Sequence, residues 1–200
     1  MSTNLTNLSL LDAAAGGSSG GPLREEEIQF LQTLFQAISE AADFQSALNV
    51  ALSQVCKVTD WEYGEAWIPS RERTVLELSP VWYGNRGERA YLLALDQFRL
   101  CSEGFIFPPA IGLPGRVWSS QQPEWICDAS AQSETFFLRN QIAKAFGIRA
   151  GFGVPVLANH EVQAVLVFFT SEDREEDRQL VKLAKAAAMQ LGAFLQRSLA

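Results

Sequence analysis

Residues 149–169, RAGFGVPVLANHEVQAVLVFF, are the stretch that decides the fold. Residues 149–157 and 162–169 are rich in β-branched and aromatic side chains, which favour β-strands. The four residues between them, Ala158-Asn159-His160-Glu161, have the length and composition of a hairpin turn. The stretch therefore predicts two antiparallel strands joined by a hairpin.

Two glycines in the first of these strands leave one of its faces without side chains. Gly151 and Gly153 alternate with Phe152 and Val154, and successive side chains of a strand point to opposite faces. Something large must cover the bare face, either a helix or a ligand, and a helix is the commoner reason for strand glycines. We therefore expect a helix over this face.

Further strands and helices precede the hairpin. Residues 61–68 and 75–82 have the aromatic and β-branched composition of strands, and residues 124–127 resemble a short strand. Three helices are expected over residues 89–100, 113–120 and 135–146. Gly147, directly after the last of them, is a residue type that commonly ends a helix.

The two ends of the chain carry the longest helices. The first is expected over residues 23–42, after which Asp43 caps a second helix. Thr170 and Asp173 have the spacing of a capping box and predict the start of the last helix. Strands interrupted by helices, with long helices at both ends, predict an α+β fold. In it a central antiparallel sheet has flanking helices, and the terminal helices pack together.

Apolar stripes on the two terminal helices indicate a homodimer. The apolar residues recur at spacings of three and four, which suits pairing with another helix. The expected dimer interface consists of Ile28, Leu31, Phe35, Ile38, Leu180, Leu183, Ala187 and Leu191.

Composition excludes several classes of partner. The net charge is −7 without any run of Lys or Arg, so nucleic acid is not an expected partner. The longest apolar run, residues 164–169, is far shorter than the roughly 20 residues that span a bilayer, so membrane insertion is not expected. Three widely spaced cysteines and the lack of a signal peptide favour a cytoplasmic location. Residues 1–22, rich in Ser, Asn, Ala and Gly, predict a flexible tail before one domain at 23–200.

Three segments within residues 43–197 resemble the GAF domain family. They are residues 112–118 with 123–126, residues 137–156, and residues 162–169. GAF modules of bacterial, notably cyanobacterial, multi-sensor histidine kinases and cyclases are the most similar. The resemblance implies a sensory or regulatory domain of signal transduction that is not an enzyme. It also implies a small-molecule ligand, homodimerisation and a signalling-protein partner.

Some GAF domains attach a bilin, bind a cyclic nucleotide or reduce methionine sulfoxide, and this sequence lacks the residues that those members use. Leu138 and Arg139 stand where bilin-binding members carry a Cys-His pair, so no covalent bilin is expected and the cofactor is unknown. The Asn-Lys pair of cyclic-nucleotide-binding members is missing as well. A thiol-dependent methionine sulfoxide reductase is a less favoured function, because residues 113–115 contain no cysteine where those enzymes carry one. Cys101 and Cys127 are expected to be small buried residues.

Two further polar residues have a functional and a structural interpretation. His160 is expected to be a turn residue, and one histidine without a nearby Cys or acidic cluster predicts no metal site. Glu65, between Tyr63 and Trp67, faces either a pocket or solvent, and we favour solvent.

Large aromatic rings are expected in the core, with a subset lining the cavity that GAF domains hold between sheet and central helices. Two arginines are the charges expected to face a ligand, which would then be anionic. The candidate ligand contacts are Trp82, Arg99, Phe107, Trp118, Phe137 and Arg139. The alternative function is a ligand-free structural or interaction scaffold, whose cavity its own side chains fill.

Overall fold

A six-stranded antiparallel sheet forms the middle layer of the molecule. The computed structural model describes residues 25–85 and 89–198. The strands lie in the order β3-β2-β1-β6-β5-β4, and every neighbouring pair is antiparallel. They are β1 (Tyr63–Pro69), β2 (Leu76–Gly84), β3 (Ile106–Phe107), β4 (Glu124–Ile126), β5 (Gly151–Ala158) and β6 (Glu161–Phe169).

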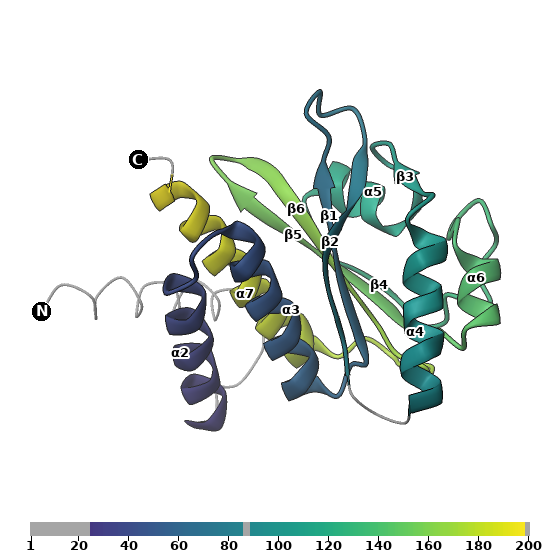
Figure 1. Cartoon of the computed structure of the whole chain (residues 1–200), viewed down its shortest axis with the longest axis horizontal. Helices are drawn as coiled ribbons and strands as arrows, with labels where there is room; N and C mark the ends of the chain where they lie inside the picture. Colours follow the sequence, from purple (N-terminus) through teal and green to yellow (C-terminus); the bar gives the residue numbers. More distant parts are fainter. Residues whose placement is uncertain (1–24, 86–88, 199–200) are drawn as a thin grey trace, which may run out of the picture.

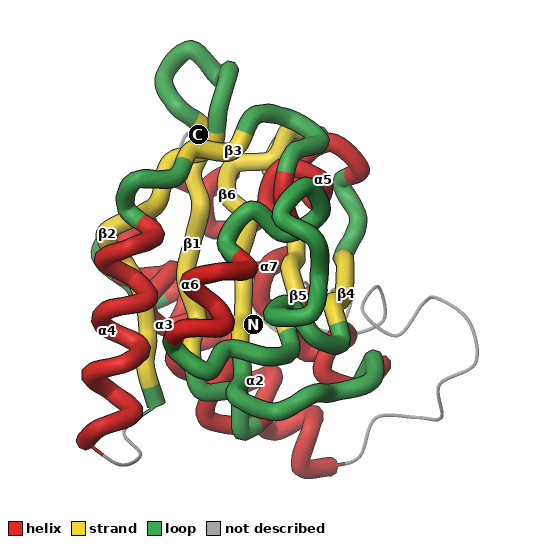
Figure 2. Tube along the Cα trace, turned by 90° about the vertical axis from the view of Figure 1, so that its right-hand side faces the viewer, coloured by secondary structure: helices red, strands yellow, loops and turns green. Residues whose placement is uncertain are grey.

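Helices cover both faces of this sheet (Figures 1 and 2). The terminal-helix face is covered by α3 (Phe44–Thr59) and α7 (Arg178–Ser198), and α2 (Glu25–Ser39) packs on these two helices. The short-helix face is covered by α4 (Arg89–Ser102), α5 (Gly112–Ser120) and α6 (Asn140–Ala145). The predicted antiparallel sheet with flanking helices and packed terminal helices is therefore confirmed.

The side chains of strand β6 contribute alternately to the cores on the two faces of the sheet. Leu166 and Phe168 belong to the core under the terminal helices, whereas Val165, Val167 and Phe169 belong to the core under the short helices. Because successive side chains point to opposite faces, a strand covered on both sides is apolar throughout. This accounts for the continuous apolar run that the sequence shows here.

Three local predictions are confirmed: the helix cap, the covered glycine and the hairpin turn. The Asp43 side chain accepts a hydrogen bond of 2.7 Å from the backbone N–H of Ser46 and caps α3. A side chain added at Gly153 would lie 3.0 Å from Val117 of α5, so a helix covers this glycine as expected. Asn159 and His160 both have positive φ in the hairpin turn.

Two helices begin well after their predicted starts, and the first helix, expected to reach residue 42, ends at Ser39. The expected helix 135–146 is reduced to α6 (Asn140–Ala145), because residues 133–139 form successive turns. The last helix begins at Arg178 and not after Thr170, whose backbone still pairs with Ala150. Asp177 caps this helix by accepting hydrogen bonds from the backbone N–H groups of Gln179 and Leu180.

The apolar stripes of the terminal helices lie inside the chain itself. Ile28 is half-buried, and the other seven residues expected at a dimer interface are buried against α2, α3, α7 and the sheet. Those seven side chains are covered within one protomer. The expected tail, residues 1–22, lies outside the described residues. Within the described ranges, no helix is long and apolar enough to cross a bilayer.

Candidate functional site

The central strand β1 places a carboxylate in the core of the short-helix face. Tyr63, Glu65 and Trp67 alternate along the strand and are each 0% exposed. The prediction that Glu65 faces solvent is therefore wrong. The physical reason is that β2 and β6 flank β1 on both sides while helices cover both faces of the sheet.

Three donors orient this carboxylate, and one of them, Arg139, also neutralises its charge. Tyr63 Oη donates to Glu65 Oε2 at 3.0 Å. Trp67 Nε1 and Arg139 Nη2 each donate to Glu65 Oε1 at 2.7 Å. The Arg139–Glu65 ion pair is completely buried on both sides, and such a pair needs additional hydrogen bonds to offset the loss of hydration.

Arg139 joins three elements of the short-helix face. It directly precedes α6, reaches Glu65 on β1, and donates from Nη1 to Ser102 Oγ at 3.0 Å. Ser102, at the end of α4, donates in turn to the carbonyl oxygen of Phe98 at 2.8 Å. The Arg139 Nε atom is buried without a hydrogen-bond partner. Arg139 therefore fixes the segment before α6 against the sheet and α4.

Aromatic rings enclose the guanidinium group. Five ring centroids lie between 5.1 and 5.7 Å from Arg139 Cζ, within the range of cation–π attraction. These rings belong to Trp67, Phe98, Phe107, Phe137 and Phe169. Together with Glu65, we call them the aromatic cage.

The cage also perturbs Tyr63. Burial, and to a lesser degree the neighbouring Glu65 carboxylate, raises the pKa of Tyr63 well above its usual value. The phenol therefore stays protonated at neutral pH and remains a donor to Glu65.

The structure brings three of the six candidate ligand contacts into the cage, namely Phe107, Phe137 and Arg139. Trp82 packs on Tyr63 outside the cage, with ring centroids 5.8 Å apart. Arg99 lies over Trp82 and pairs with Glu103 at 2.6 Å. Trp118 is half-buried beside the short-helix core.

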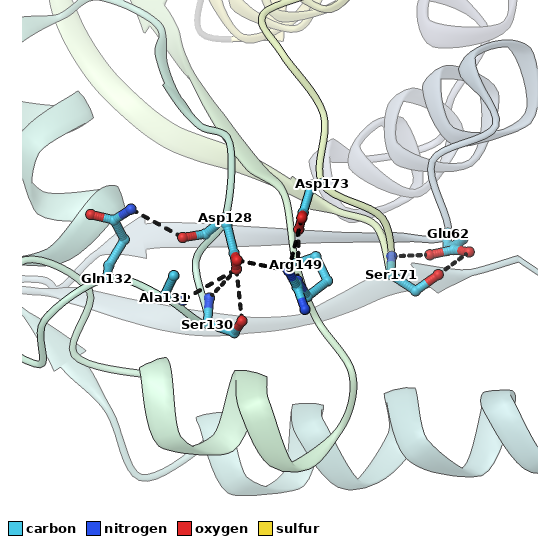
Figure 3. Close-up of polar contacts among 8 residues, drawn as sticks. All are labelled: Glu62, Asp128, Ser130, Ala131, Gln132, Arg149, Ser171 and Asp173. Carbon is cyan, nitrogen blue, oxygen red and sulfur yellow. Dashed lines mark hydrogen bonds and ion pairs between the residues drawn. The ribbon is translucent and has the colours of Figure 1, made fainter.

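A second polar cluster lies at the end of the sheet (Figure 3). The Arg149 guanidinium contacts Asp173 at 2.7 and 2.8 Å and Asp128 at 2.9 Å. Asp173 belongs to residues 171–177, which we call the β6–α7 segment. Ser171 in the same segment donates from its backbone N–H and its hydroxyl to Glu62. This sheet-end cluster therefore connects the segment before α7 with the loop after β4.

Asp128 organises that loop. Its Oδ1 accepts hydrogen bonds from the backbone N–H and hydroxyl of Ser130 and from the N–H of Ala131. Burial alone would raise the pKa of Asp128, but these hydrogen bonds and Arg149 outweigh it and hold the pKa below its usual value. Asp128 is therefore a carboxylate under physiological conditions.

The thiols do not form a reactive pair. Cys101 and Cys127 are exposed, not buried as expected, and all three cysteines are free. Although Cys127 is exposed, partial desolvation of its thiol and the nearby Glu175 carboxylate raise its pKa, and its Sγ lies 3.7 Å from that carboxylate. A nucleophilic thiol needs the opposite shift. Among the described residues no cluster of three potential metal ligands occurs.

Sequence reasoning singled out Glu65 but favoured the wrong face for it, and it missed the sheet-end cluster. A signal for Glu65 existed, because two-residue alternation places it on the same face as Tyr63 and Trp67. The partners of Arg149 carry no comparable signal, because they come from separate loops.

A comparison with family models identifies the family. The model of the GAF domain matches residues 41–196. Among curated proteins, a truncated basic helix-loop-helix protein A of Pisum sativum is 31% identical over 87 residues, 44% of this chain and 23% of that protein. The anthocyanin regulatory Lc protein of Zea mays is 31% identical over 92 residues, 46% of this chain and 14% of that protein. The match thus spans less than a quarter of either relative.

Solved structures show the same fold at low identity. The GAF domain of an Acinetobacter phosphoenolpyruvate-protein phosphotransferase has a TM-score of 0.67 at 14% identity, covering 88% of this chain and 96% of that one. The free methionine-R-sulfoxide reductase of Neisseria meningitidis has a TM-score of 0.65 at 13% identity, covering 92% and 99%. With the family model matched over most of its length, this chain belongs to the GAF domain family.

Proposed function

We propose that this chain is a non-catalytic sensory or regulatory GAF domain whose regulatory site is the aromatic cage. The observation that carries the proposal is the fully buried Arg139–Glu65 pair between the sheet and the short helices. A buried ion pair is weak support for stability, so its presence in the core favours a role in selecting one conformation. GAF domains are commonly sensory or regulatory modules, and the maize relative is named a regulatory protein.

A contiguous set of contacts supports communication from the cage to α7. Arg139 and Asp128 lie in the same irregular segment between β4 and α6. Arg149 joins Asp128 to Asp173 in the β6–α7 segment (Figure 3). Trp125 Nε1 also donates to the carbonyl oxygen of Arg174 at 2.8 Å. A rearrangement at the cage would therefore alter the segment that leads into α7.

Hydrogen–deuterium exchange tests this coupling. Ser102→Ala removes one acceptor of Arg139 and leaves the ion pair in place. We expect faster exchange in residues 128–146 and also in the β6–α7 segment and the first turn of α7. Ser79→Ala is the matched control, because Ser79 is also buried and its hydroxyl accepts a hydrogen bond from the nearby backbone N–H of Val81 on β2. A response confined to the contacts of Ser102 would contradict regulation through the cage.

A ligand-free scaffold is the second candidate. The observation in its favour is that Phe107, Phe137 and Arg139 are at most 1% exposed, so the chain's own side chains fill the cage. Native mass spectrometry of protein purified from its own source separates the two functions. A retained small molecule supports the sensor, and the bare mass together with the confined exchange response supports the scaffold.

We also propose that the domain forms a homodimer, as the family resemblance implies. Because seven of the eight expected interface residues are buried within the protomer, the contact must use other surfaces. Light scattering at high micromolar concentration tests this, and a monomer there would contradict it.

A further inference from the structure

The charge of the cage favours one class of ligand. Among the residues whose burial the structure describes, Glu65 and Arg139 are the charged side chains that are fully buried. If the Arg139 side chain were to leave, the space would retain a carboxylate and the faces of five rings. Ring faces carry negative electrostatic potential. An anion in this place would be repelled by the carboxylate and by the rings, and a cation would be attracted by both.

We propose that the aromatic cage is a cation site of guanidinium type, and that Arg139 occupies it as a tethered ligand. An external ligand of this site then carries a guanidinium or alkylammonium group in place of that of Arg139. This inference rests on the proposed regulatory site and names its ligand class. It replaces the anionic ligand that the sequence analysis expected from Arg99 and Arg139, because Glu65 neutralises Arg139 and Glu103 pairs with Arg99.

The donor pattern favours a guanidinium group over other cations. Planar guanidinium donors match a carboxylate and a second acceptor at once, as Arg139 does with Glu65 and Ser102. The buried Nε of Arg139 makes no hydrogen bond, because the tether fixes its direction. A free guanidinium ion has no tether and can orient all of its N–H groups.

The position of Arg139 makes exchange feasible. The residue is the last of the irregular turns at 128–139 and directly precedes the six-residue α6. Segments with little regular backbone bonding open locally at lower free energy than core strands. The Glu65 side of the cage, in contrast, lies on the central strand β1. Opening would thus remove the tethered cation together with Phe137 of the same segment, and would leave Glu65 and the other four rings in place.

Chemical rescue tests the ligand class. Arg139→Ala removes the tethered guanidinium, and thermal unfolding is followed with added guanidinium chloride, methylammonium chloride, urea or sodium sulfate at matched ionic strength. We expect a saturable increase of Tm with guanidinium at millimolar concentration, a smaller one with methylammonium, and none with urea, which has the same shape without the charge. For so small a ligand an affinity on the order of millimolar is what its size allows.

Two controls tie the rescue to the cage. Wild type should show no increase, because Arg139 fills the site, and the double variant Glu65→Gln with Arg139→Ala should lose the rescue. If Arg139→Ala does not fold alone, its refolding yield with low guanidinium against urea gives the same comparison. Stabilisation by sulfate, equal effects of guanidinium and urea, or rescue without Glu65 would overturn the cation site. None of these results would alter the exchange response of Ser102→Ala, so the proposed function stands or fails separately.

Discussion

The two arginine–carboxylate clusters have the same chemistry and opposite surroundings. The Arg139–Glu65 pair is completely buried, whereas the Arg149 side chain is 41% exposed and its partner Asp173 is 57% exposed. Water and salt screen the sheet-end contacts, and neither reaches the interior pair. Similar hydrogen-bond distances therefore carry different energies. The interior pair constrains the conformation of the core, and the sheet-end cluster holds loops together.

The largest expected effect is that of breaking the interior pair. Glu65→Gln keeps the shape of the side chain but leaves the Arg139 charge unpaired, and removing one partner of a buried pair costs about 3–5 kcal/mol. Urea denaturation measures the loss. Asp173→Asn is the sheet-end control, and its effect should be a small fraction of this. Equal losses for the two variants would show that burial does not distinguish the clusters.

A double-mutant cycle sharpens the same point. Arg139→Met combined with Glu65→Gln removes both charges, so the double variant should be less destabilised than the sum of the single variants. Coupled neighbours differ from additivity by about 0.5–3 kcal/mol. The corresponding cycle of Asp173→Asn with Arg149→Met should be close to additive. Additivity at the interior pair would mean that the two charges do not depend on one another.

The sheet-end cluster should respond to pH. Asp128→Asn weakens the contacts of a partly exposed carboxylate, with an expected loss of about 1 kcal/mol at neutral pH. Because the folded pKa of Asp128 is lowered, its contribution is present above the unfolded pKa of about 3.9 and is lost as pH falls through the folded pKa. Thermal unfolding between pH 2 and 7 should show the two proteins converging below about pH 4. A difference in Tm between the two proteins that persists at pH 2 would show that the loss of stability comes from the changed shape of the side chain and not from its charge.

Thiol reactivity gives the smallest effect. Cys101 and Cys127 are exposed and should react with a thiol reagent in the native protein, whereas Cys56, buried and with a raised pKa, should react only after unfolding. Glu175→Gln should accelerate the reaction of Cys127 a few-fold, because the carboxylate that opposes its thiolate is removed. Cys101 serves as the internal control. An unchanged rate at Cys127 would show that Glu175 does not act on the thiol.

The confirmed predictions depend on interactions between residues close in the sequence, such as helix caps and hairpin turns. Asp43 caps α3 through a residue three positions away, and the β5–β6 hairpin follows from strand composition and a four-residue turn. Where the predicted start of the last helix failed, contacts distant in sequence decided the outcome. Thr170 continues the pairing with Ala150 instead of capping a helix, and Asp173 binds Arg149.

The sequence by itself determined five of the six strands, their order among the helices and the antiparallel sheet, because periodicity, caps and turns act between residues close in the chain. The GAF family followed from three segments that resemble it. Only the tertiary structure decided which apolar stripe is covered within the protomer and which charge is buried. Glu65 lies on the interior face because β2, β6 and the short helices enclose β1, and its partner Arg139 is 74 residues away. Burial depends on what the rest of the chain places over a residue, and local sequence does not specify that.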